Sequence, residues 1–243
     1  MRMESWSVGF EGDADVERHA GIDPDPAHPE PGDSRSRRTI QLRIVSDYIC
    51  PWCFIGLTRV EKLRDEFDIE LEVGAFELRP GIPPEALPRE EVSRGRVYPP
   101  GYLENLRDTA ADAGIEMKRP ALVPNTRKAH EATEFAKEHN RLWEIHRSLF
   151  HAYFEEERNI GDVDVLCDVA AGVGLDAGQL RVALAEGRYA SEMEEQLAWA
   201  RAAGVTGVPT IIFSGKFKVV GAQDYAVFRD VAGRVAAGRL QIS

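Results

Sequence analysis

The stretch that decides the fold is Asp47-Tyr48-Ile49-Cys50-Pro51-Trp52-Cys53, in which two cysteines are separated by two residues. Before it, residues 40–45 alternate between apolar and polar side chains, which is typical of a strand. After it, apolar residues recur at three- and four-residue steps, which predicts a helix ending near residue 68. Residues 69–75 alternate again. The sequence therefore predicts a βαβ unit with a right-handed crossover, and the cysteine pair lies where its first strand meets its helix.

The position of the pair predicts chemistry as well as fold. Cys50 should begin the helix, where free backbone N–H groups and the helix dipole favour a negative charge. Because the thiolate is the nucleophilic form of cysteine, Cys50 is the expected nucleophile. Cys53 should lie one turn inside the helix, near Cys50 and shielded by the core. We expect it to resolve a mixed disulfide between Cys50 and a substrate.

Two other interpretations of the pair are less favoured. A zinc site needs about four ligands, and Cys167 is the only other cysteine in the chain. We therefore expect no metal. Two inert core thiols are the second alternative, since an apolar site would suppress their ionisation. Cys167 itself lies on a predicted apolar helix, and we expect it to pack as a small hydrophobe rather than act as a regulatory thiol.

A second motif, Gly207-Val208-Pro209-Thr210, precedes a β-rich stretch. Proline at the first position of a strand loses no ladder hydrogen bond, and the cis form is cheap only before proline. Alone, the motif would be a simple boundary between a turn and a strand. Beside a Cys-x-x-Cys pair, it predicts a cis Pro209 that faces the cysteines and a Val208 backbone free to pair with an extended substrate. A hairpin over 210–220 and a last helix over about 224–237 should follow.

The chain divides into three parts by composition. Residues 1–38 are rich in proline and poor in branched apolar side chains, which predicts a flexible acidic tail. Alternatively, this tail docks on a partner or on the protein itself through Trp6 and Phe10. Residues 39–78 and 204–243 should form one α/β domain, interrupted by a helical insertion over 79–203.

Charge and hydropathy exclude several classes of protein. Lys and Arg total 30 and Asp and Glu total 41, so the net charge of −11 argues against a nucleic-acid partner. No apolar run approaches the roughly 18 residues of a membrane span. The first ten residues lack the pattern of a secretory signal. Three cysteines do not suit a secreted disulfide scaffold.

Taken in order, these motifs resemble the DsbA family of the thioredoxin fold, and within it the FrnE-type proteins, cytoplasmic relatives grouped with 2-hydroxychromene-2-carboxylate isomerases. The resemblance implies an α/β thioredoxin fold (βαβ…ββα) with a large all-helical insertion. The pieces that carry it, spread over about 39 to 240, are Asp47 to Cys53 with Ile55-Gly56; Phe76-Glu77-Leu78; Asn125-Thr126 with Ala129-His130; Leu149-Phe150 with Ala152-Tyr153-Phe154; Gly207-Val208-Pro209; and Gly221-Ala222-Gln223.

The resemblance also implies site residues. Cys50 and Cys53 match the family's nucleophile and resolving thiol, and Pro209 matches its cis-proline. We expect Trp52 to form the floor or lip of the cleft. Other matched positions imply cleft-lining or substrate-binding residues beside the pair: Asn125, His130, Gly221 and Gln223.

The function so predicted is that of a cytoplasmic thiol–disulfide oxidoreductase. Its substrate would be a disulfide-containing protein or a small thiol, with glutathione as the candidate reductant or co-substrate and no other cofactor. Secreted DsbA proteins carry His between the cysteines, whereas neutral Trp52 cannot support the thiolate, so we expect a less oxidising pair. The alternatives are a glutathione-dependent isomerase or transferase of small aromatic or polyketide-like molecules, and a binding protein with a redox sensor. A homodimer is left open.

Overall fold

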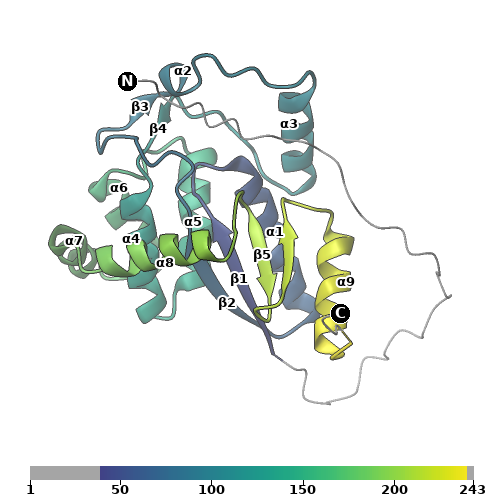
Figure 1. The fold of residues 1–243 in the computed structure, drawn as a ribbon. Coiled ribbons are helices and arrows are strands. Elements are labelled where there is room, and N and C mark those ends of the chain that lie inside the picture. Colours follow the sequence, from purple (N-terminus) through teal and green to yellow (C-terminus); the bar gives the residue numbers. More distant parts are fainter. Residues whose placement is uncertain (1–38, 240–243) are drawn as a thin grey trace. The chain divides into compact units, whose positions relative to one another are not determined.

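A four-stranded sheet forms the centre of the described chain, which covers residues 39–239 of the computed structural model (Figure 1). The strand order is β2-β1-β5-β6, in which β1 and β2 are parallel and the other neighbouring pairs are antiparallel. The prediction of a flexible tail over 1–38 lies outside the described residues. The strands are β1 (Ile40–Ser46), β2 (Ile69–Ala75), β5 (Thr210–Phe213) and β6 (Phe217–Val220).

Helices cover both faces of this sheet. Helices α1 (Pro51–Glu66) and α9 (Tyr225–Ala236) lie on the face to which Ile44 of β1 belongs. Helix α8 (Ala190–Ala202) packs on the opposite face, where it meets Val45 and the neighbouring strands. Because successive side chains of a strand point to opposite faces, β1 contributes apolar residues to both layers. Strand β1 is therefore covered on both faces where Ile44 and Val45 lie.

The segment between β2 and β5 is mainly helical, as predicted. It contains α2 (Arg89–Val92), α3 (Tyr102–Asp112), α4 (Arg127–Glu138), α5 (Leu142–Phe154), α6 (Val163–Gly172), α7 (Ala177–Glu186) and α8. It also contains a small antiparallel ladder that the sequence did not predict, between β3 (Leu87–Pro88) and β4 (Leu122–Val123).

Local sequence accounts for several helix boundaries in the segment. The Asp162 carboxylate accepts a hydrogen bond from the Asp164 amide at the start of α6, as expected of an N-cap. Asp176 does the same for α7 through the Gln179 amide. The glycine at 187 then ends α7 in the left-handed conformation that glycine adopts readily.

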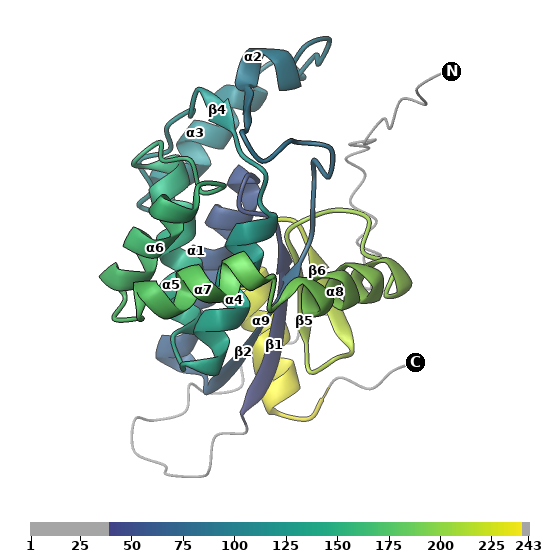
Figure 2. The same ribbon diagram turned by 90° about the vertical axis from the view of Figure 1, so that its left-hand side faces the viewer.

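Helix α3 is the part of the insertion that bears on the cysteine pair. It packs against α1, and the two ribbon views show it beside the first turns of that helix (Figures 1 and 2). The segment between β2 and α3 is rich in proline, which limits its regular structure to β3 and the single turn of α2. In the part of the chain that the structure describes, no helix is both long enough and apolar enough to cross a membrane.

Candidate redox site

The two cysteines lie where the sequence predicts, at the junction of β1 and α1. Cys50 is the N-cap residue, with extended backbone angles of φ −92° and ψ 112°, and Pro51 occupies the first helical position. Proline suits this position because its missing N–H would be unpaired there anyway. Cys53 lies in the first turn, and both side chains are free thiols. Cys50 is 5% exposed and Cys53 is completely buried, so of the two thiols only Cys50 is open to a substrate.

The loop before β5 closes over the first cysteine. The Val208–Pro209 peptide bond is cis, as the sequence predicts. The Cys50 Sγ lies 3.6 Å from the Val208 carbonyl oxygen, within reach of a weak S–H hydrogen bond. The Gly221 amide donates to the Pro209 carbonyl oxygen at 2.8 Å. Segments about 160 residues apart in the chain therefore meet at one sulfur atom.

Two residues of α1 contact the loops before β5 and after β6. A Cβ atom built on Gly56 would lie 3.1 Å from the Pro209 Cγ, so glycine permits the close approach of the helix to the proline ring. One turn further on, the Arg59 guanidinium donates hydrogen bonds to the carbonyl oxygens of Ala222 and Gln223. Helix α1 thus carries the cysteines and also holds the loops that face them.

The surroundings of Cys53 give the two thiols different properties. Burial, and next a hydrogen bond with the Cys50 thiol, raise the pKa of Cys53 well above its usual range. Cys53 therefore stays protonated at neutral pH and can share its proton with the Cys50 sulfur.

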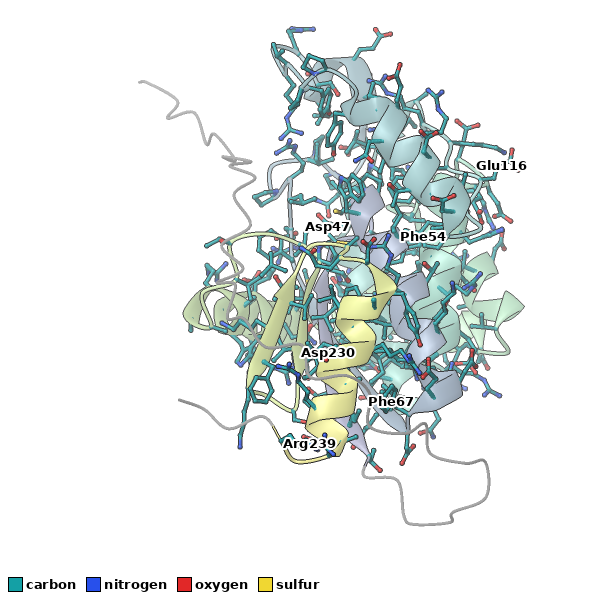
Figure 3. The ribbon with its side chains drawn as sticks, turned by 90° about the vertical axis from the view of Figure 1, so that its right-hand side faces the viewer. Asp47, Phe54, Phe67, Glu116, Asp230 and Arg239 are labelled. Carbon is teal, nitrogen blue, oxygen red and sulfur yellow. The ribbon has the colours of Figure 1, made fainter. Side chains whose placement is uncertain are left out.

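A buried carboxyl group lies beside the pair. Asp47 has no exposed surface, and its Oδ2 atom accepts a hydrogen bond of 2.6 Å from the Leu78 amide. Burial raises the pKa of Asp47 to about 7, although hydrogen bonds from Leu78 and Thr126 lower it. Figure 3 shows Asp47 at the end of the sheet where α1 begins, with Phe54 on that helix. The carboxyl group is therefore largely neutral at mildly acidic pH.

A second group of buried polar side chains, centred on Tyr48, lies next to Asp47. The Tyr48 hydroxyl lies 2.8 Å from His146 Nδ1 and also bonds to the Thr133 hydroxyl. His130 Nε2 lies 4.0 Å from Asp47 Oδ1. Burial lowers the pKa values of His130 and His146 to about 3, so both rings are neutral at physiological pH. The network joins the β1–α1 junction to α4 and α5.

The aromatic residue between the cysteines faces α3. The Trp52 Nε1–H donates a hydrogen bond of 2.9 Å to the Tyr102 hydroxyl, and the two rings meet edge to face. Tyr102 stacks on Tyr98, with ring centroids 5.0 Å apart and planes 11° from parallel. Trp52 is half-buried, as expected of a residue at the lip of the site.

The other predicted site residues do not gather into one cluster. Asn125 precedes α4, and its side chain bonds to the Ile82 carbonyl oxygen and the Arg127 amide. His130 is 3% exposed, and its Nε2 atom has no hydrogen-bond partner among the described residues. Gly221 bonds to Pro209 through its backbone, whereas the Gln223 side chain bonds to the Val220 carbonyl oxygen. Of these four residues, Gly221 is the one with a bond to the loop that faces Cys50.

Four residues of the site were not predicted. Asp47 and Tyr48 directly follow β1 next to the cysteines, so their burial could have been inferred from a strand with two covered faces. Tyr102 and Arg59 carry no such signal, since their roles depend on contacts between elements far apart in the chain. Cys167 is buried, with its Sγ 3.4 Å from the Ala177 carbonyl oxygen, in keeping with the predicted packing role.

Among the described residues, neither a metal-binding cluster nor the groove beside α1, β2 and α5 includes the cysteines. Within residues 39–239, no three His, Cys, Asp or Glu side chains are grouped to hold a metal ion. A groove of about 690 Å³ lies between α1, β2 and α5, and the charged side chains that line it, such as Arg64 and Glu72, are mixed in sign. Neither cysteine contributes to this groove.

Comparisons with known proteins agree with this geometry. A family model described as a DSBA-like thioredoxin domain matches residues 41–232. The uncharacterized protein YwbO of Bacillus subtilis is 34% identical over 193 residues, which is 78% of this chain and 94% of that protein.

Solved structures show the same architecture. A probable DsbA oxidoreductase of Streptomyces coelicolor, SCO1869, is 28% identical over 84% of this chain and 92% of its own, with a TM-score of 0.75. A 2-hydroxychromene-2-carboxylate isomerase, 19% identical, covers 82% of this chain and 97% of its own with a TM-score of 0.64, a likeness of fold. The predicted thioredoxin-like α/β fold with a helical insertion is confirmed.

Proposed function

Since the chain belongs to the DSBA-like thioredoxin domain family, we propose that it is a thiol–disulfide oxidoreductase in which Cys50 attacks and Cys53 resolves. One observation carries this proposal. Cys50 begins α1 with its sulfur 3.6 Å from the Val208 carbonyl oxygen, while Cys53 is buried one turn behind it. A substrate sulfur can thus reach the first thiol and is kept from the second.

The proposed reaction has two steps. The Cys50 thiolate attacks one sulfur of a substrate disulfide, the substrate S–S bond breaks, and the first substrate thiolate leaves and takes a proton from water. Cys53 then loses its proton and attacks the Cys50 sulfur. The mixed disulfide breaks, the second substrate thiolate leaves, and a Cys50–Cys53 disulfide forms. Two electrons pass to the substrate, and a thiol such as glutathione must return them before the next cycle.

Val208 supports the binding step in this proposal. Its carbonyl oxygen faces the Cys50 sulfur, next to the cis bond to Pro209. An extended substrate lying along this residue would place its cysteine against Cys50 and add backbone hydrogen bonds. The loop is held by Gly221 and backed by Gly56, so it is positioned before the substrate arrives.

We extend the proposal to a FrnE-type protein that works in the cytoplasm, on the strength of its ordered motifs. The cytosol keeps thiols reduced, so reduction or isomerisation of disulfides is the expected direction there. A glutathione-dependent isomerase is less favoured. Such an enzyme needs polar side chains free to hold glutathione, whereas Asn125 and Gln223 are bonded to the protein's own backbone.

The decisive experiment is a redox titration of the purified protein in glutathione buffers, read by mass shifts after thiol alkylation. We expect a single reversible two-electron transition confined to Cys50 and Cys53. Cys167→Ser should titrate like the wild type, whereas Cys53→Ser should accumulate a mixed disulfide on Cys50. A protein in which the pair stays reduced at every ratio of glutathione to its disulfide is not an oxidoreductase of this kind.

A further inference from the structure

We propose that the outer edge of β2 is a docking site for an extended polypeptide segment in which basic and apolar residues alternate. The segment would add one strand to the four-stranded sheet, along the groove between β2, α1 and α5. This inference goes beyond the proposed redox function and does not depend on it, because neither cysteine lines the groove. Its partner is a protein recognised away from the redox pair.

The backbone of β2 is paired on one side. In the described chain, β2 ends the sheet and β1 is its neighbour. The Ile40 amide donates to the Asp68 carbonyl oxygen at 2.8 Å, which sets the alternation of the ladder. The even-numbered residues of β2 therefore direct their backbone groups to β1, and Leu71 and Val73 direct theirs to the outer edge. Within residues 39–239, the amides and carbonyl oxygens of Leu71 and Val73 have no hydrogen-bond partner.

The same edge is closed at the end of β2. The Ala75 amide donates to Gln196 Oε1 of α8 at 2.8 Å, and Gln196 Nε2 donates to Glu134 at 2.6 Å. No such side chain of the described residues caps Leu71 and Val73. An uncapped strand edge is a template for another strand, because a strand presents donors and acceptors at the matching spacing. The expected occupant is therefore an extended peptide.

The groove of about 690 Å³ runs along this edge. It is lined by Leu71 and also by Glu70 and Glu72, whose side chains point to the other face of β2. Leu142 and Trp143, at the start of α5, add apolar surface on the side of Leu71. Successive side chains of a bound strand would therefore meet apolar groups on one face and carboxylates on the other. This arrangement favours a segment with alternating character.

The charges of the groove favour basic residues in that segment. Arg147 pairs with Glu61, and the Arg64 guanidinium lies 4.4 Å from the centroid of the Trp143 ring. Three more charged side chains are paired in the same way: Glu72 with Arg43, Lys137 with Glu134, and Glu144 with Arg141. Glu70 is exposed and has no ion pair within residues 39–239. A cationic side chain on the bound strand would supply its partner.

A second copy of the chain fits this edge less well. Two β2 edges related by a twofold axis would pair in antiparallel fashion. If the axis passes by Leu71, the Glu70 side chain of one copy lies opposite the Glu72 side chain of the other. If it passes by Glu72, the two Glu72 side chains lie opposite each other. Like charges directly opposite destabilise a strand pair, so charge favours a different, basic partner.

The experiment measures binding of a fluorescent heptapeptide of alternating valine and lysine to the reduced, full-length protein, with a valine–glutamate heptapeptide for comparison. We expect saturable binding of the lysine peptide and about tenfold weaker binding of the glutamate peptide. In hydrogen-exchange NMR, the Leu71 and Val73 amides should exchange rapidly in the free protein and slowly in the complex. The Glu70 and Glu72 amides should be protected in both, because β1 already pairs with them.

Methylated peptides test whether the contact is a strand ladder. N-methylation of one alternate set of peptide amides should abolish binding, and N-methylation of the other set should leave it intact. The sensitive set is that of the valines if the peptide runs antiparallel to β2 and that of the lysines if it runs parallel. Loss of binding with both sets, or with neither, would rule out strand addition.

Charge reversal supplies the matched variants. Glu70→Lys should weaken binding of the lysine peptide about fivefold and strengthen that of the glutamate peptide. Glu104→Lys makes the same change on the exposed surface of α3 and should alter neither. Equal binding of the two peptides, or no saturable binding at about 1 mM, would overturn the proposal. So would a free protein that is dimeric in sedimentation with its Leu71 amide already protected, since a second copy would then occupy the edge. These outcomes are independent of the redox titration.

Discussion

Replacing Asp47 by Asn tests whether a buried carboxyl group beside the cysteines is held neutral by the fold. The Asp47 side chain has no exposed surface, and burial raises its pKa from 3.8 to about 7. A carboxyl group whose pKa is raised in the folded state favours folding while it is protonated. This contribution to the free energy of unfolding is fully present below the pKa that Asp47 has in the unfolded chain. It is lost as the pH rises through the pKa that Asp47 has in the folded protein. The amide introduced by Asp47→Asn cannot titrate, so the variant lacks this pH dependence.

The size of the effect follows from the two pKa values. Proton linkage with 3.8 unfolded and about 7 folded predicts that the wild type loses about 2 to 3 kcal/mol relative to Asp47→Asn between about pH 5 and about pH 8. The assay is urea unfolding of both reduced proteins at several pH values, followed by circular dichroism. Other titrating groups, including the buried histidines, are common to both proteins and cancel in the difference.

Asp230→Asn is the matched control for this experiment. Asp230 lies on the surface of α9, where it pairs with Arg234, and its side chain is 60% exposed. Its replacement should leave the pH dependence of unfolding close to that of the wild type. If the stability curves of the wild type and Asp47→Asn run parallel from pH 5 to pH 8, the Asp47 carboxyl group is not held neutral and the argument is wrong.

Four further predictions test other parts of the site. Tyr48→Phe leaves His146 Nδ1 and the Thr133 hydroxyl without their shared partner, so it should lower the free energy of unfolding by about 1–3 kcal/mol in urea titrations; an unchanged midpoint would contradict the network. Gly56→Ala should fail to give the roughly 1 kcal/mol that alanine normally adds to a helix interior, because its Cβ would press on Pro209; a full gain measured by thermal unfolding would show that the proline ring moves freely. The rings of His130 and His146 have pKa values of about 3, so NMR spectra at pH 5 should show both rings neutral. The stability that comes from these lowered pKa values should be lost as the pH falls from the ordinary imidazole range toward 3. Protonated rings at pH 5 would contradict the effect assigned to burial. The reduction potential of the Cys50–Cys53 pair should be more negative than the value of about −120 mV typical of DsbA, since Trp52 brings no charge; a potential at or above that value would refute the role assigned to the residues between the cysteines.

Most of the fold could be predicted because it depends on local pattern. The period of two in β1 and β2, the period near 3.6 in α1, and the hairpin signal at Ser214-Gly215 each follow from the side chains of one short segment. The cysteines and Pro209 could be placed for the same reason. A Cys-x-x-Cys pair at a strand–helix junction and a Val-Pro before a strand restrict the backbone wherever they occur.

The rest of the site depends on contacts that short patterns do not encode. Asn125 and His130 are five residues apart, and α4 begins between them. The Asn125 side chain therefore bonds to the loop backbone, whereas the His130 side chain points into the core. The β3–β4 ladder consists of two residues on each side, too few to produce an alternating pattern. Tyr102 reaches Trp52 only because α3 packs on α1. Such pairings follow from tertiary packing, which no short stretch of sequence specifies.

Helix α1 has a spacing that restricts changes in chain length. Cys50, Cys53, Gly56 and Arg59 follow one another at intervals of three residues, and three of them contact the loops at 208–209 or 222–223. One residue inserted between Cys53 and Arg59 would turn the later part of the helix by about 100° and direct Arg59 away from the carbonyl oxygens it holds. Insertions and deletions should therefore be tolerated in the loops between α5 and α8 but not between residues 50 and 59. A library of single-residue insertions, selected for soluble and redox-active protein, would show a gap at this stretch.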